Sequence, residues 1–428
     1  MPSLSERLKS LGVKVGARDL PQPPPPKFES VQTTLSLEPT IFSMGTSYIR
    51  EQLIRIDDPA EYHDLNSYLS TLASWAGQPS IARLKANAFA FLDTETTGLS
   101  GGSGTIPFLI GIGRFEGDQF HLAQFFLRNP AEEPAHLQAI EHFLAPCEAL
   151  VTFNGKAFDI PIINARFQLQ RWRSPLAELA SIDLLHLARR LWRQRLPSRT
   201  LGNLEVEILR SSRTEEDVPG WAIPQMYADY LLTGDAQLLK SVFYHNAMDV
   251  ISMAELFNHL AGLLSTPLEA HIDHSIDLVA LARLFEDIGD FDTAIQLYSN
   301  VLGLAEADQN QQDADEALPK PVLLDAINRL AHIHKLRDNL TAAIPLLEKA
   351  ASLQHVHAHI ELAKIYEHRM KNYQEAIQWT ITAIDIVNST HFPLIERQQM
   401  LSELEHRLRR LQVKLNSHGY RDKEVPKA

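Results

Sequence analysis

The spacing of apolar residues divides the chain into regions with different expected secondary structure. Apolar runs and alternating stretches predict five strands, at 88–92, 108–115, 119–127, 149–153 and in a short segment leading into Asp183. Helical spacing predicts helices at 132–144, after residue 157, and through most of 184–264. A strand hairpin followed by alternating strands and helices is typical of a mixed sheet covered by helices. We therefore expect an α/β domain with a five-stranded mixed sheet over residues 85–264.

Beyond residue 270 the apolar residues keep helical spacing, and small residues recur in register. They are Ala282, Ala331 and Ala363 in the first helix of each expected pair, and Ala294, Ala343 and Ala376 in the second. Ala343 and Ala376 are 33 residues apart, whereas Ala294 and Ala343 are 49 apart because an acidic, glutamine-rich insertion at 306–320 intervenes. The pattern resembles the tetratricopeptide repeat, in which small residues let paired helices pack closely. A nonrepeating helical bundle is the alternative.

The remaining segments are less patterned. Five of the six residues at 21–26 are proline, which imposes an extended conformation, so the first 40 residues are expected to be an arm, either disordered or a docking segment. One helix is expected at 60–75, and a helix at 394–415 would cap the repeats. The expected organisation is an arm or linker at 1–40, a lead-in at 41–84, the α/β domain at 85–264, helical repeats at 270–390, a capping helix at 391–416 and a tail at 417–428.

Composition places the chain among ordinary globular proteins, with 45% hydrophobic and 22% charged residues in a length of 428. Its single cysteine, Cys147, excludes an intramolecular disulfide and a cysteine-rich zinc site and fits a reducing compartment. No apolar run approaches the length of a membrane span, and residues 1–20 hold no signal-type apolar segment, so we expect a cytoplasmic location and no membrane partner. The net charge of −13 argues against nonspecific coating of nucleic acid, which phosphate neutralisation drives.

Two acidic residues follow the first predicted strand. Asp93 and Glu95 are two positions apart, so both side chains leave the same face of an extended strand. Two carboxylates held together repel each other, and a hard divalent cation such as Mg²⁺ or Mn²⁺ relieves that repulsion. For this triplet alone, the alternative is a strand end with two solvated acids.

Two further acidic blocks favour a metal site. Asp159 follows a strand and a glycine turn, which places it near a helix start beside the sheet, where an aspartate is otherwise a cap. Asp249 lies four residues after His245, so both share one face of a helix. With Asp93 and Glu95 they form the set that a two-metal phosphodiesterase site requires, in which two cations activate water and stabilise the leaving oxygen.

These blocks resemble the three exonuclease motifs of the DEDD superfamily of 3′→5′ exonucleases. The matching residues are Asp93-x-Glu95 with Thr96-Thr97-Gly98-Leu99, Asn154 through Phe158-Asp159, and His245-x-x-x-Asp249. More closely, residues 89–260 resemble the YprB-like RNase H-like domain family, through Asp183-Leu184-Leu185, Arg189-Arg190-Leu191-Trp192, Asp217-Val218-Pro219-Gly220 and His245-Asn246-x-x-Asp249-Val250. Members of that family often carry tetratricopeptide-like helices after the nuclease domain. The resemblance implies an RNase H-like fold, two divalent cations (Mg²⁺ or Mn²⁺) on the four carboxylates, and a nucleic-acid substrate.

Two neighbouring residues, His245 and Tyr244, are candidates for the general base. Superfamily members have either Tyr four residues before the last Asp or His five residues before it, whereas this chain has His245 at four and Tyr244 at five. Helical geometry favours His245, because Tyr244 points away from the face of Asp249. A helix that begins only after His245 would leave Tyr244 as the base.

Candidate nucleic-acid contacts lie beside the motifs and in one basic stretch. They are Thr96, Thr97, Gly98, Leu99, Asn154, Lys156, Arg193 and Arg195. Five arginines at 189–199 surround Trp192, with no acid from 184 through 204, which suits a surface that holds phosphates and stacks a base. Equally, the arginines can form a solvated helix face with Trp192 buried beneath it. Lys156, next to the second motif, is a better placed phosphate contact.

We therefore expect a metal-dependent nuclease, a 3′→5′ exonuclease acting on single-stranded DNA or RNA ends, joined to helical repeats that bind a protein partner. The alternative is a noncatalytic nucleic-acid-binding adaptor, whose signature would be a lost carboxylate; all four are present. An endonuclease acting on branched or structured substrates would use the same metals, and the sequence does not separate it from an exonuclease.

Overall fold

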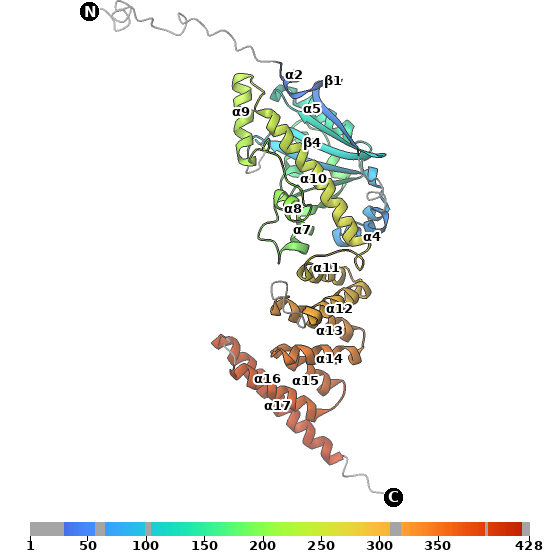
Figure 1. The fold of residues 1–428 in the computed structure, drawn as a ribbon, viewed down its shortest axis with the longest axis vertical. Helices are drawn as coiled ribbons and strands as arrows, with labels where there is room; N and C mark the ends of the chain where they lie inside the picture. Colours follow the sequence, from blue (N-terminus) through green and yellow to red (C-terminus); the bar gives the residue numbers. More distant parts are fainter. Residues whose placement is uncertain (1–29, 56–64, 99–103, 309–317, 390–392, 422–428) are drawn as a thin grey trace, which may run out of the picture.

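The computed structural model describes residues 30–55, 65–98, 104–308, 318–389 and 393–421. Figure 1 shows an elongated molecule, with a helix-covered sheet at one end and a stack of helices at the other. Several predicted features lie outside the described residues: the arm up to residue 29, the helix start at 60–64, Leu99, most of the 306–320 insertion and the end of the tail.

One mixed sheet organises the α/β part of the chain. Within the described residues it has seven strands: β1 (Glu38–Phe42), β2 (Gly45–Arg55), β3 (Phe89–Thr96), β4 (Pro107–Glu116), β5 (Gln119–Phe126), β6 (Ala149–Thr152) and β7 (Ala180–Asp183). Their order is β1-β2-β5-β4-β3-β6-β7. The pairs β3–β6 and β6–β7 are parallel and the other pairs antiparallel. The strands β3 to β7 are those that the sequence predicts.

The prediction of a five-stranded sheet is wrong, because β1 and β2 extend the sheet beyond β5. β2 pairs with β5 along the whole length of β5. Burial does not alternate cleanly along the two added strands, where Ile41 and Leu53 remain 85% and 60% exposed. Without a clear period of two, the apolar pattern of residues 38–55 gives little indication of a strand.

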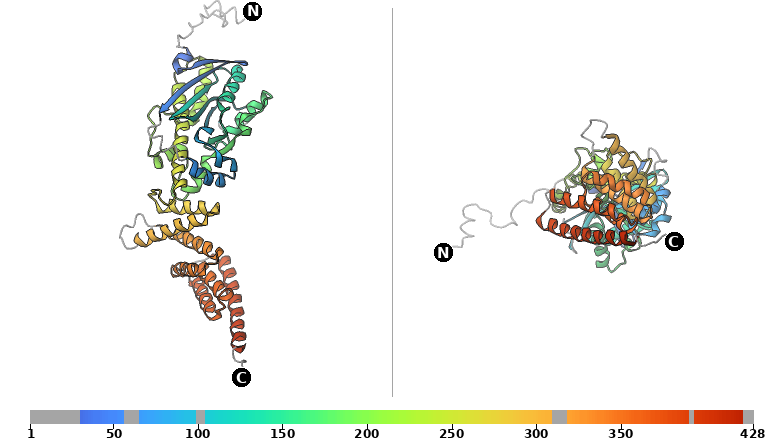
Figure 2. Two further views of the ribbon diagram at one scale, coloured as in Figure 1. Left: turned by 90° about the vertical axis from the view of Figure 1, so that its right-hand side faces the viewer. Right: turned by 90° about the horizontal axis from the view of Figure 1, so that it is seen from below.

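Helices cover both faces of the sheet (Figure 2). One face carries α5 (Glu133–Leu144) and α6 (Asp159–Leu169), whose Ile140 and Ile163 pack with Leu92 of β3. The other face carries α4 (Leu65–Ala76), α7 (Leu184–Trp192) and α10 (Leu239–Ser265). There Phe257 of α10 lies 5.5 Å from Phe91 of β3, measured between ring centroids. Because β3 is packed on both faces, its position between α6 and α10 is fixed. Three further α-helices belong to this part: α2 (Val31–Leu35), α8 (Leu201–Glu207) and α9 (Ile223–Thr233).

Two glycines of β4 let α10 approach the sheet closely. A Cβ atom at Gly111 would lie 2.3 Å from Oδ1 of Asn246, and one at Gly113 would lie 2.9 Å from Cγ1 of Val250. Both distances are shorter than normal contacts between nonbonded atoms, so a larger residue would push α10 away from the sheet. These glycines therefore set the distance between β3 and the third acidic block, which lies on α10.

A stack of helices follows the α/β part. The helices are α11 (Ser275–Asp287), α12 (Phe291–Asp308), α13 (Lys320–Leu336), α14 (Leu340–Ser352), α15 (Val356–His368), α16 (Tyr373–Ser389) and α17 (Leu394–Arg421). Figure 1 shows successive helices packed on one another, with α17 along α16 at the far end. The small residues singled out in the sequence are all fully buried between these helices: Ala282, Ala294, Ala331, Ala343, Ala363 and Ala376. Their burial explains why small residues recur there.

The last helix is held to the stack by one buried carboxylate. Glu367 of α15 accepts hydrogen bonds from Arg407, Arg410 and Lys414 of α17, each at 2.8 Å. Leu404 and Leu411 on α17 are buried, so this helix covers the apolar face of the preceding helices. Among the described residues, no helix has the length and apolar character needed to cross a membrane.

Candidate active site

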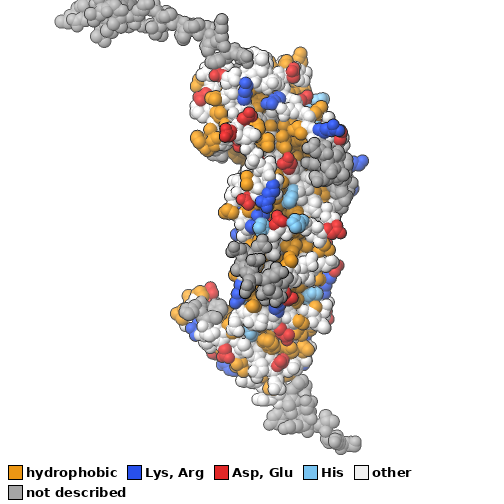
Figure 3. Space-filling view, viewed as in Figure 1, with side chains coloured by type: hydrophobic (Ala, Val, Ile, Leu, Met, Phe, Trp, Pro, Cys, Tyr) orange, Lys and Arg blue, Asp and Glu red, His pale blue; other side chains and the backbone are white. Residues whose placement is uncertain are grey.

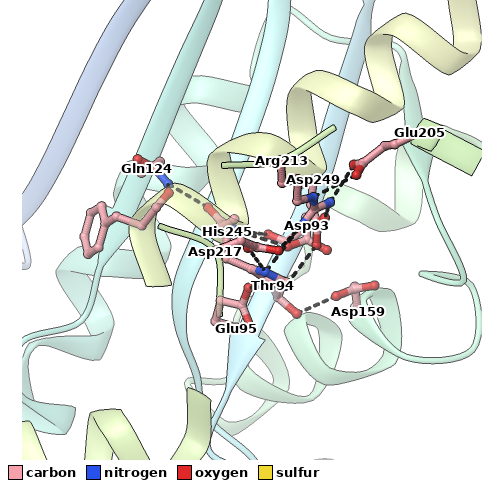
Figure 4. Close-up of polar contacts among 12 residues, drawn as sticks. Asp93, Thr94, Glu95, Gln124, Asp159, Glu205, Arg213, Asp217, His245 and Asp249 are labelled. Atoms are coloured by element: carbon pink, nitrogen blue, oxygen red, sulfur yellow. Dashed lines mark hydrogen bonds and ion pairs between the residues drawn. The ribbon is translucent and has the colours of Figure 1, made fainter. Parts of the chain in front are cut away.

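The predicted carboxylates come from three elements that meet at the carboxyl end of β3. Asp93 and Glu95 lie on this strand, Asp159 is the first residue of α6, and Asp249 lies on α10. Figure 4 shows their side chains gathered around the strand end. Ligand atoms of Glu95, His245 and Asp249 all lie within 4.8 Å of one another. The fold thus brings the three acidic blocks of the sequence together.

Asp93 is oriented by an amide network. Nδ2 of Asn246 on α10 donates to Oδ2 of Asp93 at 2.9 Å. Nε2 of Gln124 on β5 donates to Oδ1 of Asn246 at 3.0 Å and to the carbonyl of Phe243 at 2.7 Å. Both amides are buried, so the network fixes the first aspartate relative to α10.

Asp159 is positioned by the turn between β6 and α6. Asn154 in this turn has a φ of +66°, and a Cβ atom at Gly155 would lie 2.5 Å from the nearest side-chain atom. Asp183, at the end of β7, accepts hydrogen bonds from the backbone N–H groups of Asn154 at 2.8 Å and Lys156 at 3.3 Å. The aspartate of β7 therefore stabilises the turn that leads into Asp159.

Burial and mutual repulsion raise the pKa values of the clustered carboxylates. Burial and the charge of Asp249 raise the pKa of Asp93 and of Glu95 well above their ordinary values. Burial raises the pKa of Asp159 to about 6, although Thr94 of β3 donates its hydroxyl to this carboxylate. Burial also raises the pKa of Asp249. Four ionised carboxylates in one buried place are therefore unfavourable unless a cation neutralises them.

This donor set fits hard divalent cations. Carboxylate oxygens are the ligands that Mg²⁺ and Mn²⁺ prefer. Glu95 and Asp249 place such oxygens beside His245, while Asp93 is hydrogen-bonded to Asn246 and Asp159 to Thr94 at the edge of this group (Figure 4). Burial, and then the charges of neighbouring carboxylates, raise these pKa values, and a bound cation would relieve both effects. The residues present are therefore suited to holding metal ions of this class.

The two candidate bases differ in orientation. Nε2 of His245 lies 3.5 Å from Oδ2 of Asp249 and 4.0 Å from Oε1 of Glu95. The hydroxyl of Tyr244 instead accepts a hydrogen bond from the backbone N–H of Thr214 at 3.0 Å. α10 begins before both residues, so the arrangement that would favour Tyr244, a helix starting after His245, does not occur. His245 faces the carboxylates and Tyr244 does not.

Three residues with no role assigned from the sequence complete this side of the site. Arg213, between α8 and α9, donates to Glu205 from Nε at 2.8 Å and from Nη2 at 2.6 Å. Its Nη2 also donates to Oδ1 of Asp249. Asp217, in the same loop, lies with Oδ1 2.7 Å from Nδ1 of His245. Asp217 belongs to a block that resembles the family, but no local pattern marks Arg213 or Glu205.

Five of the residues predicted to contact nucleic acid are close in sequence to Glu95 or Asp159. They are Thr96, Thr97, Gly98, Asn154 and Lys156. Oγ1 of Thr96 donates to the carbonyl of Gly98 at 2.7 Å, and Oγ1 of Thr97 accepts from the N–H of Ile106 at 3.0 Å. These bonds shape the end of β3, while Lys156 is exposed on the turn before α6. The lysine side chain is therefore exposed, and the two threonines hydrogen-bond to local backbone groups.

The basic stretch at the end of α7 does not join the carboxylates. Nε of Arg195 donates to Oδ2 of Asp277 on α11 at 2.7 Å, and both side chains are largely buried. Trp192 is 3% exposed, so the alternative of a buried indole is correct and base stacking on it is not. Arg193 is exposed at the helix end. Arg195 therefore joins the α/β part to the first helix of the stack.

Replacing Arg195 by alanine is expected to destabilise the protein. Asp277 would remain largely buried without its partner, which costs about 3 kcal/mol of unfolding free energy. Urea unfolding of Arg195→Ala, beside the exposed control Arg193→Ala, measures the difference, and the double variant Arg195→Ala/Asp277→Ala should recover part of it. Unchanged stability with a flatter salt dependence of single-strand binding would instead identify Arg195 as a phosphate contact.

Comparisons with known proteins agree with this architecture. Residues 90–261 match the family model described as RNase_H superfamily, and residues 278–312 match that of the tetratricopeptide repeat. The chain is 36% identical over 301 residues to a protein of Bacillus subtilis (strain 168) named "Uncharacterized protein YprB", a match that covers 69% of this chain and 68% of that protein. The family predicted from the motifs is confirmed: the chain belongs to the YprB-like family of RNase H-superfamily proteins that carry tetratricopeptide repeats.

Proposed function

We propose that the protein is a metal-dependent nuclease, a DEDD-type exonuclease that removes nucleotides from the 3′ ends of single strands. The observation that carries the proposal is the group formed by Glu95, His245 and Asp249, together with two further carboxylates, Asp93 and Asp159, that are close enough for all four pKa values to be raised. The match to the RNase H superfamily supports nucleic acid as the substrate. The tetratricopeptide repeat supports a protein partner for the helical stack.

Each side chain of the site has a distinct proposed role. Asp93, Glu95, Asp159 and Asp249 hold two divalent cations, Mg²⁺ or Mn²⁺. When bound, these cations supply Lewis-acid stabilisation of charge on the phosphate and on the leaving oxygen. His245 accepts the proton of the attacking water, since its Nε2 faces the carboxylates.

Asp217 orients the imidazole for this task. Its carboxylate lies 2.7 Å from Nδ1 of His245, so the tautomer with the proton on Nδ1 is stabilised and Nε2 is left free to accept a proton. Lys156, exposed on the turn before α6, is proposed to contact a phosphate of the bound strand, with Asn154 beside it.

Incubation with labelled single-stranded DNA and RNA tests the proposed function. In Mg²⁺ or Mn²⁺ the strands should be shortened, and chelation of the metal should stop the reaction. A circular single strand has no free end, so its cleavage would show that the protein is an endonuclease and not an exonuclease. Binding of both nucleic acids without cleavage under any metal condition would make the protein a noncatalytic adaptor.

Replacing His245 by alanine is expected to lower kcat about 10²-fold or more, because proton transfer by a positioned side chain is lost. Tyr244→Phe is the matched control and should leave kcat little changed, since it removes a hydroxyl that only accepts from the backbone of Thr214. Single-turnover cleavage measures both. Both variants should keep the metal-induced rise in melting temperature, because the carboxylates remain. If Tyr244→Phe lowers kcat more than His245→Ala does, Tyr244 is the general base.

A further inference from the structure

A positively charged side chain lies among the candidate metal ligands. Nη2 of Arg213 donates to Oδ1 of Asp249, while Nη1 lies 3.2 Å from Nδ1 of His245 and 3.5 Å from Oδ2 of Asp217 (Figure 4). The arginine side chain is only 12% exposed. Because a guanidinium stays protonated in proteins, the site contains a permanent positive charge before any metal arrives.

Glu205 holds that guanidinium in place. Its two carboxylate oxygens accept from Nε and Nη2 of Arg213 at 2.8 Å and 2.6 Å, which is a bidentate pair. Glu205 is buried on α8, and α8 packs against α10, the helix that carries Asp249. A bidentate pair fixes the plane of the guanidinium as well as its distance. Arg213 is therefore anchored to the scaffold at the point where it meets the metal ligand.

Because Arg213 is anchored, the two carboxylate oxygens of Asp249 have different neighbours. Oδ1 is occupied by Arg213, whereas Oδ2 faces His245 and, beyond it, Glu95. Arg213 partly neutralises the negative charge of Asp249, so a metal cation is attracted to this carboxylate less strongly. The positive guanidinium also repels the cation directly. At separations of a few ångströms such charge interactions change affinities measurably even when water screens them.

We propose that Arg213 is the resident counter-cation of the carboxylate site, anchored by Glu205, and that it limits the affinity of the site for divalent metal. In the metal-free protein it offsets part of the repulsion among the carboxylates. In the metal-bound protein it keeps one oxygen of Asp249 and leaves the other for the metal. The inference rests on the proposed function only in placing metal at these carboxylates, and it requires no nucleic acid.

Calorimetric titration of the metal-free full chain with Mn²⁺ alone tests the proposal. Arg213→Gln should bind Mn²⁺ about tenfold more tightly, because a positive charge close to Asp249 is removed. Glu205→Gln should bind it more weakly, because the charge of Arg213 is no longer compensated. Arg213→Lys keeps the charge and should stay near the wild-type affinity. The matched control is Arg210→Gln, an exposed arginine of the same loop that pairs with Asp273.

The outcomes separate this proposal from its competitors. Weaker Mn²⁺ binding by Arg213→Gln would overturn it, because Arg213 would then orient Asp249 for the metal. Unchanged affinity would also overturn it and leave Arg213 a purely structural role. If melting curves show that Arg213→Gln does not fold, a tenfold loss of affinity in Arg213→Lys would overturn it instead.

The same titration also distinguishes this proposal from the proposed nuclease function. If no variant binds Mn²⁺, both fail. If the predicted order of affinities is found in a protein that cleaves no nucleic acid, the counter-cation role stands and the nuclease function fails.

Discussion

Replacing Asp93 by asparagine is expected to reduce metal-dependent cleavage of single strands by about 10³-fold or more, since several kcal/mol of transition-state stabilisation depend on the bound metals. Asparagine keeps the size of the side chain, and its amide oxygen can still accept the hydrogen bond from Asn246. The substitution removes one negative charge from the ligand set. The loss should therefore come from weakened metal binding and not from unfolding.

Single-turnover cleavage beside a matched aspartate variant measures this effect. Asp118→Asn makes the same chemical change in the exposed turn between β4 and β5 and should cleave at the wild-type rate. Melting curves of both variants establish that they are folded. If Asp93→Asn cleaves as fast as Asp118→Asn, the four carboxylates are not the reaction centre.

Acidification from pH 8 to pH 5 is expected to stabilise the metal-free protein relative to its Asp159→Asn variant, which lacks one of the clustered carboxyl groups. Burial raises the pKa of Asp159 from 3.8 to about 6, so the folded state binds this proton more tightly than the unfolded state does. The resulting stabilisation is complete below the unfolded pKa and is lost as the pH rises through about 6. Two pKa units correspond to about 3 kcal/mol of unfolding free energy, of which about half is gained by pH 5. The raised pKa values of Asp93 and Glu95 act in the same direction.

Another buried carboxylate, Glu367, loses its stabilising contribution at low pH and so sets a lower limit to the pH range of this stabilisation. Hydrogen bonds from Arg410 and Lys414 overcome the effect of burial and hold the pKa of Glu367 at about 2. Stabilisation by this glutamate is therefore lost only as the pH falls below about 4.5, the ordinary value for a glutamate. Burial lowers the pKa of His136 to about 3, so this residue destabilises the folded protein as the pH falls below about 6.5 and opposes the gain from Asp159. The contribution of Asp159 is therefore measured as a difference between the wild type and Asp159→Asn.

Melting temperatures in a metal chelator, measured from pH 8 to pH 5, test this prediction. At pH 8 Asp159→Asn should melt at a higher temperature than the wild type, and acidification to pH 5 should narrow this difference by about 3 °C. Mg²⁺, which neutralises the same carboxylates, should stabilise the wild type more at pH 8 than at pH 5. A difference between wild type and Asp159→Asn that stays constant from pH 8 to pH 5 would contradict the electrostatic description of the site.

Periodicity in the sequence was sufficient for the elements that are buried on a regular face. Strands β3 to β7 and the helices that carry Asp159 and Asp249 follow from apolar runs and helical spacing, and the buried alanines of the helical stack follow from their register. β1 and β2 were missed because burial does not alternate cleanly along them: Tyr48 and Ile49 are buried side by side in β2, whereas Ile41 of β1 and Leu53 of β2 are exposed. Such a pattern leaves no period of two to detect.

The four carboxylates could be found because spacing determines which side chains share a strand or helix face. Arg213 and Glu205 could not, because their importance depends on a loop and a helix meeting across the fold. The same limit explains the basic stretch around Trp192. Its lack of local acids suggested a phosphate surface, but Arg195 meets Asp277, which lies on a helix of the following region.

Cleavage of a 5′-labelled single strand in Mn²⁺, with its 3′ end either free or chemically blocked, tests the central claim most directly. The four-carboxylate site and the family resemblance together predict a ladder of progressively shorter labelled products from the free strand, and none from the blocked strand or in a chelator. Both strands remaining intact under every metal condition would contradict the claim that this site is a metal-dependent nuclease.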